Sequence, residues 1–160
     1  MAGPERVVFD CNVFLQALIS AQGPAARCFE AAQSGRVALF YSQEVLAELT
    51  DVARRPKIVQ RFGVTDEAVE IFTELIEGAG TLVENVQQVF HYPRDPKDAH
   101  YVDLAVAVSA NLVVSRDKDL LALNDPGTPE REALAQLGCD LLVVTPVGLL
   151  ERLEKPSDAE

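Results

Sequence analysis

Acidic side chains follow two of the apolar runs that the sequence predicts as strands. Asp10 comes directly after the run 7–9. Asp117 comes shortly after the run 112–114, and Asp119 lies two residues further on. Open α/β sheets bind their ligands at the carboxyl ends of their strands. A helix cap or a turn explains either aspartate by itself, but two strands that both lead into an aspartate favour a site.

Asp98 and Glu48 lie within helical patterns, where their phase indicates which way they point. With about 100° between successive residues, Asp98 shares a helix face with the apolar Val102, and an inward-facing acid needs a compensating partner such as a metal ion. Asp103 lies away from that face, so we expect it to be solvated. Glu48 borders the apolar stripe of its helix and is a better ligand candidate than Glu44, which the helix dipole favours in a first turn anyway. A solvated edge position is the alternative for Glu48.

Several carboxylates gathered at one edge of a sheet repel one another unless cations bind between them. Mg²⁺ and Mn²⁺ prefer oxygen ligands, and one or two such ions could activate a water molecule and stabilise a leaving oxygen. The sequence leaves the number of ions open. Of the two histidines, we expect His100 on the surface of a helix and His91 in a loop. A metal-free mechanism that uses two imidazoles is therefore disfavoured.

The chain has 160 residues, of which 25 are acidic and 14 basic, and a formal net charge of −11. This charge argues against a protein that coats duplex nucleic acid with a basic face, but not against an enzyme that gathers carboxylates around cations. Its three cysteines include no C-x-x-C motif, which argues against a disulfide framework or a zinc ribbon. No apolar run has the length of a signal sequence or a membrane span, so we expect a soluble, cytoplasmic protein.

Short β-branched runs alternate with longer helical periods, a pattern typical of a parallel sheet with helices on both faces. The expected strands are 7–9, 37–41, 81–83, 112–114 and 141–144. The expected helices are 12–20, 25–34, 43–55, 58–62, 66–78, 95–109 and one that begins at Thr145-Pro146. We expect one α/β domain over residues 1–154 and a frayed tail at 155–160.

Four segments, in order and at suitable spacing, resemble the PIN domain family, in particular the branch described as toxin components of toxin–antitoxin systems. They are VVFDCNV (7–13), SQEVLAELTDVARRPKI (42–58), RDPKDAHYVDLAVAVSANLVVSRDKDLL (94–121) and TPVGLL (145–150). The resemblance covers residues 6–150. It implies a three-layer α/β/α sandwich with a central, mainly parallel sheet, and a metal-dependent nuclease that acts on RNA.

The resemblance also implies a catalytic site and its cofactor. The acidic cluster of the family corresponds here to four main acids and one auxiliary metal ligand: Asp10, Glu48, Asp98, Asp117 and, as the auxiliary, Asp119. Mg²⁺ or Mn²⁺ would be the cofactor, and the candidate partners are an RNA substrate, an antitoxin protein and a second copy of the chain. We expect Asn12 and Ser115 to orient the acids. The chain departs from the family at Cys11, where Thr or Ser is usual, and this change could alter hydrogen bonding to Asp10.

Basic residues are concentrated in two segments, where they could guide RNA phosphates toward an otherwise anionic protein. The first group follows the Glu48 helix and the second flanks the later acids: Arg54, Arg55, Lys57 and Arg61, then Arg94, Lys97, Arg116 and Lys118. Ordinary solvated charge is the alternative for each of them.

Two other functions share features with this sequence. A haloacid-dehalogenase-like phosphatase also begins with an aspartate after its first strand, but it needs a second acid two residues later, where this chain has Asn12. A PIN-like scaffold that binds RNA or a partner without cutting is the main alternative, because retention of the four acids does not prove turnover.

Overall fold

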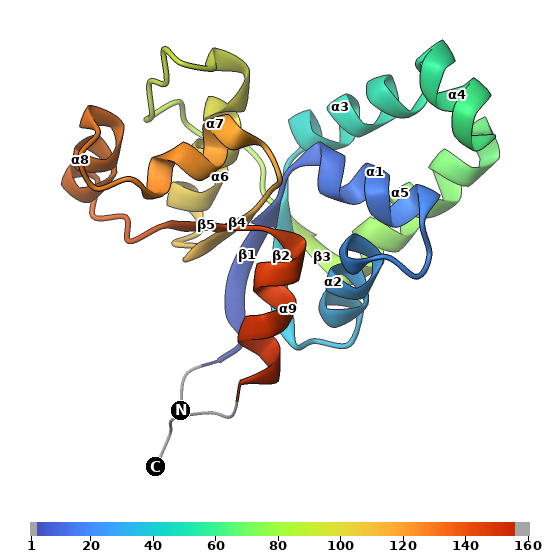
Figure 1. Ribbon diagram of the computed structural model, residues 1–160, viewed down its shortest axis with the longest axis horizontal. Coiled ribbons are helices and arrows are strands. Elements are labelled where there is room, and N and C mark those ends of the chain that lie inside the picture. Colours follow the sequence, from blue (N-terminus) through green and yellow to red (C-terminus); the bar gives the residue numbers. More distant parts are fainter. Residues whose placement is uncertain (1–2, 156–160) are drawn as a thin grey trace.

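The computed structural model describes residues 3–155, and at its centre these residues form a parallel sheet in the order β3-β2-β1-β4-β5 (Figure 1). The strands are β1 (Glu5–Phe9), β2 (Val37–Tyr41), β3 (Gly80–Leu82), β4 (Leu112–Val114) and β5 (Leu142–Val144). The chain adds β2 and β3 on one side of β1 and then crosses to add β4 and β5 on the other. The position between β1 and β4 is therefore the switch point where such sheets open a ligand crevice.

Helices cover both faces of this sheet, which confirms the predicted three-layer α/β/α fold. α1, α2, α3 and α5 pack together on one face with α9 against α2, while α6, α7 and α8 lie on the other face (Figure 1). The helices are α1 (Cys11–Ile19), α2 (Pro24–Gln33), α3 (Gln43–Ala53), α4 (Pro56–Phe62), α5 (Asp66–Ala79), α6 (Ala99–Ala107), α7 (Lys118–Leu121), α8 (Pro129–Gln136) and α9 (Pro146–Glu154), with 3₁₀ turns at Pro96–Asp98 and Ala122–Asn124.

Local chemistry explains where several helices begin and end. The Ser42 hydroxyl accepts a hydrogen bond from the Val45 amide at 3.2 Å and so caps α3. Thr65 caps α5 in the same way. Gly63 ends α4 with φ 66°, a left-handed conformation that favours glycine. These ends agree with the predicted elements to within a few residues, whereas α7 and α8 were not anticipated.

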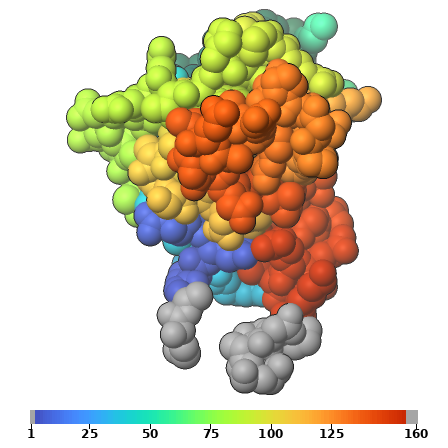
Figure 2. Space-filling model, turned by 90° about the vertical axis from the view of Figure 1, so that its left-hand side faces the viewer, coloured from blue at the N-terminus to red at the C-terminus, as the bar shows by residue number. Residues whose placement is uncertain are grey.

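A long segment, residues 83–95, joins β3 to the turn before α6 and runs without regular secondary structure. In Figure 2 this segment, coloured yellow-green, lies along the top of the molecule next to α7 and α8 in orange. Asp103 of α6 holds it, because Asp103 Oδ1 accepts hydrogen bonds from the amides of Val89 (2.9 Å) and Phe90 (2.8 Å). Asp103 is 4% exposed, so the expectation that it is solvated was wrong: its helix face is covered by the folded-back segment rather than by water.

Within residues 3–155, no helix combines the length and the apolar character that crossing a membrane requires. The predicted frayed tail falls, beyond Lys155, on residues 156–160, which lie outside the described part of the chain.

Candidate metal-binding active site

Asp10 and Ser115 become neighbours because β1 and β4 pair in register. Phe9 lies opposite Val114, and the Asp10 amide donates to the Val114 carbonyl at 3.1 Å. The residue that follows β1 is Asp10, and the residue that follows β4 is Ser115. The Ser115 hydroxyl donates to Asp10 Oδ2. Asp10 Oδ1 accepts from the Val13 amide at 2.9 Å. Asp10 therefore caps α1 and also belongs to a cluster of polar groups at the switch point.

Burial affects the pKa of Asp10. Its side chain is almost inaccessible, at 3% exposed, and this burial raises its pKa above the ordinary value, although hydrogen bonds from Ser115 and Val13 act in the opposite direction. The Asp117 carboxylate adds a smaller repulsion that also raises it. The hydrogen bonds fix the orientation of the carboxylate without neutralising its charge.

Asp117 is tied to the same point through Ser115. Its amide donates to Ser115 Oγ at 2.9 Å, so one hydroxyl links the two aspartates. Asp117 Oδ1 accepts from the Asp119 amide at 2.8 Å and thereby caps α7. The predicted aspartates at the ends of β1 and β4 thus lie side by side.

Asp98 approaches these acids from the start of α6. Burial raises the pKa of Asp98 to about 8, and the neighbouring Asp117 and Asp95 carboxyl groups contribute to the rise. Its Oδ2 atom is buried and has no hydrogen-bond partner among the described residues. A buried carboxylate oxygen without a donor is costly, and a cation or a proton would compensate it.

Asp95 belongs to the same cluster and was missed as a ligand candidate. Asp95, Asp117 and Asp119 each place one carboxylate oxygen within 4.8 Å of the others, a grouping that could hold a metal ion. Arg94 Nε lies 2.6 Å from Asp119 Oδ1 and neutralises part of this charge. The sequence offered a signal, because Asp95 lies three residues before Asp98, but it marked only the start of the expected helix 95–109.

Glu48 is linked to the first turn of α1 by two hydrogen bonds that pass through Tyr101. The Cys11 amide donates to Tyr101 Oη at 2.9 Å, and the Tyr101 hydroxyl donates to Glu48 Oε1 at 3.1 Å. Burial, together with the carboxylates of Glu48, Asp10 and Asp98, raises the pKa of the Cys11 thiol to about 11. The thiol is therefore neutral near pH 7 and lies among three of the predicted acids.

His100 also contacts Glu48, through Nε2 and Glu48 Oε1. Its side chain is only 17% exposed, and its ring packs on Tyr101 with centroids 4.1 Å apart. The expectation of a surface position was wrong, because α3 and the segment 83–95 close over this turn of α6. His91, in contrast, lies in the loop where it was expected.

The PIN domain profile matches residues 6–119, well over half of the chain. This chain belongs to the PIN domain family. An uncharacterized protein of Methanocaldococcus jannaschii is 27% identical over 150 residues, covering 94% of this chain and 92% of that protein. Among solved structures, a chain in VapBC2 from Rickettsia felis bound to a DNA fragment from its promoter has a TM-score of 0.52 at 13% identity, covering 88% of this chain and 98% of that one.

Some basic residues of this PIN domain form ion pairs, whereas others are only known to be exposed. Arg54 and Arg55 form exposed ion pairs with Asp66 (3.2 Å) and Asp51 (3.0 Å). Arg94 is paired with Asp119, as described above. The remaining candidates, Lys57, Arg61, Lys97, Arg116 and Lys118, are exposed.

Asn12, expected to brace the acids, is exposed in the first turn of α1. It lines a cavity of about 200 Å³ that Arg116 and Pro146 also border. Ser115, the other residue expected to orient the acids, makes the direct contacts with Asp10 and Asp117.

The donor set of this PIN domain fits a hard divalent cation. The clustered ligands are carboxylate oxygens, which Mg²⁺ and Mn²⁺ prefer. The orphaned Asp98 Oδ2 and the raised pKa of Asp98 both indicate an excess of negative charge that a cation would relieve. Carboxylate oxygens alone would suffice as the protein ligands of such a cation.

Proposed function

We propose that this PIN domain is a Mg²⁺- or Mn²⁺-dependent ribonuclease. Asp10, Asp98 and Asp117 would hold the cation, Glu48 would complete the pocket, and Asp119 would be auxiliary. The single observation that carries this proposal is the buried, unpartnered Asp98 Oδ2 beside Asp117. Such an arrangement costs stability unless a cation or a proton compensates it.

The chain's own groups would orient the acids during hydrolysis. Ser115 donates to Asp10 and accepts from the Asp117 amide, so it keeps one oxygen of Asp10 in a fixed direction. Tyr101 does the same for Glu48. When bound, the cation would supply an activated water and stabilise the charge that develops on the phosphate.

The test is a gel assay of purified protein with single-stranded and hairpin RNAs in Mn²⁺, Mg²⁺ or EDTA. We expect cleavage with either metal and none in EDTA. Asp98→Asn should abolish cleavage, whereas Asp140→Asn, at an exposed position before β5, should match the wild type. Equal cleavage by Asp98→Asn and wild type would refute the mechanism. RNA binding without cleavage by the wild type would favour the non-catalytic scaffold.

We further propose an antitoxin protein as a regulatory partner in the cytoplasm, on the strength of the family resemblance, with the fold shared with a VapBC2 chain as support. A second copy of the chain is the other proposed partner. Light scattering of the purified protein alone tests the second copy, and a stable dimer is the expected result. Light scattering after coexpression with a protein encoded beside it tests the antitoxin, and a stoichiometric complex without nuclease activity is the expected result.

A further inference from the structure

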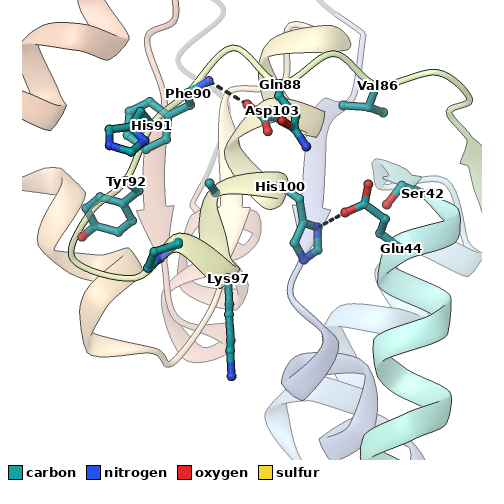
Figure 3. A pocket seen from close by; sticks show the side chains of 12 residues that line it. Ser42, Glu44, Val86, Gln88, Phe90, His91, Tyr92, Lys97, His100 and Asp103 are labelled. Carbon is teal, nitrogen blue, oxygen red and sulfur yellow. Dashed lines mark hydrogen bonds and ion pairs between the residues drawn. The ribbon is translucent and has the colours of Figure 1, made fainter.

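A pocket of about 370 Å³ opens between the start of α3, the segment 83–95 and the start of α6 (Figure 3). Its volume falls in the range of about 300–1,000 Å³ that is usual for small-ligand sites. The pocket adjoins the acids through His100, which lines it and also contacts Glu48. A ligand in this pocket would therefore lie against His100, the neighbour of Glu48.

One wall of the pocket is apolar and preformed. Phe90 and Tyr92 are buried, and their rings lie with centroids 5.7 Å apart. Asp103 holds this wall in place through the amides of Val89 and Phe90, and the Tyr92 hydroxyl donates to the Asp119 carbonyl. The segment that forms the wall is thus fixed to both α6 and α7.

The opposite rim carries polar side chains that have few partners within the protein. Among the described residues, the Glu44 and Gln88 side chains make no hydrogen bond, and Glu44 Oε2 lies 3.9 Å from His100 Nδ1. Figure 3 shows the Glu44 carboxylate and the Gln88 amide directed toward the His100 ring. An apolar wall that faces a few hydrogen-bonding groups is typical of sites that bind a small ligand.

We propose that this pocket binds one unpaired guanine base of the RNA substrate, with Glu44 as the specificity-determining residue. This inference rests on the proposed ribonuclease function. Single-stranded RNA is read by stacking bases and by hydrogen bonds to their Watson–Crick edges. Guanine presents two adjacent donors on that edge, N1–H and N2–H, and a carboxylate offers two acceptor oxygens to match them. Adenine presents one donor beside an acceptor, which a carboxylate would repel.

The first test measures base selectivity without catalysis. GMP, IMP and AMP share the same phosphate and are titrated into the protein in EDTA by NMR. Inosine lacks only the N2 amino group, so IMP should bind about 10-fold more weakly than GMP, the scale of one hydrogen bond to a charged group. AMP should bind more weakly still. Equal binding of GMP and AMP would overturn the proposal.

Glu44→Gln keeps the shape of the side chain and removes the charge. We expect it to lose at least about 10-fold of the preference for GMP over AMP. Glu67→Gln is the matched control, because Glu44 and Glu67 are both exposed and both occupy the second position of a capped helix. Glu67→Gln should keep the wild-type preference, and an equal loss in the two variants would contradict the assignment.

The second test uses RNAs with a single guanosine in a background of the other bases, cut in Mn²⁺. Wild type should cut at a constant distance from the guanosine, and inosine or Glu44→Gln should disperse the cuts. Cuts that ignore guanosine would overturn the pocket assignment. Selective GMP binding without cleavage of any RNA would support the pocket and reject the ribonuclease. Binding of free L-arginine in place of GMP would overturn the proposal in favour of a protein partner.

Discussion

Two buried aspartates of this PIN domain, Asp10 and Asp103, are equally inaccessible but differ in their surroundings. Asp103 accepts two amide hydrogen bonds at one oxygen from a loop that it holds against α6. Asp10 accepts one amide and one hydroxyl hydrogen bond and has Asp117 as a neighbour. Burial alone therefore does not distinguish a structural acid from a ligand; the charge of the neighbours does.

The two environments have opposite effects on the stability of the fold. A carboxylate surrounded by amides stabilises the fold, because its removal leaves buried donors unsatisfied. A carboxylate surrounded by other acids destabilises the metal-free fold, and that cost makes sense where a cation binds. Substitutions at the two positions should consequently move activity and stability in different directions.

The largest effect is expected on catalysis at Asp10. Asp10→Asn should lower kcat/KM for RNA by about 100-fold or more, the scale at which loss of one charge-stabilising group is felt. Its metal-free stability should equal or exceed that of the wild type, because repulsion with Asp117 is relieved. Cleavage kinetics and urea unfolding in EDTA measure the two quantities. Retained activity would place Asp10 with Asp103 as a structural acid.

The next largest effect concerns the stability that Asp103 supplies. Asp103→Ala removes the acceptor of two buried amides and should lower the free energy of unfolding by about 2–3 kcal/mol. Asp103→Asn keeps an acceptor oxygen and should lose less. Urea unfolding of the three proteins tests this order, and an Ala variant as stable as wild type would show that the segment 83–95 is held by other contacts.

A smaller effect should appear in the pH dependence of stability. The pKa of Asp98 is raised in the folded state to about 8, so the folded protein binds this proton more tightly than the unfolded chain. The metal-free protein should therefore lose stability as pH rises from about 4, the unfolded pKa, toward 8. Because Asp98 is partly open to solvent, we expect a loss on the order of 1 kcal/mol. Melts of wild type and Asp98→Asn in EDTA should converge at low pH and diverge above it; parallel curves would contradict this.

The sheet was predictable because its strands are short apolar runs with clear ends. The runs at 37–41 and 112–114 match β2 and β4, and the aspartates after β1 and β4 lie at the predicted edge. The inward direction of Asp98 was also predictable, because the periodicity of a single helix is a local property of the sequence.

Apart from the unanticipated helices α7 and α8, the failures concern contacts with distant parts of the chain. Helix phase placed Asp103 outside the core, but no local signal revealed that residues 89 and 90 fold back over it. His100 was misplaced for the same reason, since α3 covers it. Asp95 marked only the start of an expected helix, and the three-dimensional approach of Asp117 and Asp119 makes it a ligand candidate. The pocket beside His100 depends on the same folded-back segment.

The central claim is that the acids at the switch point bind a divalent cation, and a calorimetric titration of metal-free protein with Mn²⁺ tests it most directly. The account predicts saturable binding by the wild type, unchanged binding by Asp140→Asn, and at least about 10-fold weaker binding by Asp98→Asn. Equal Mn²⁺ affinity in wild type and Asp98→Asn, or no binding by a folded wild type, would contradict it.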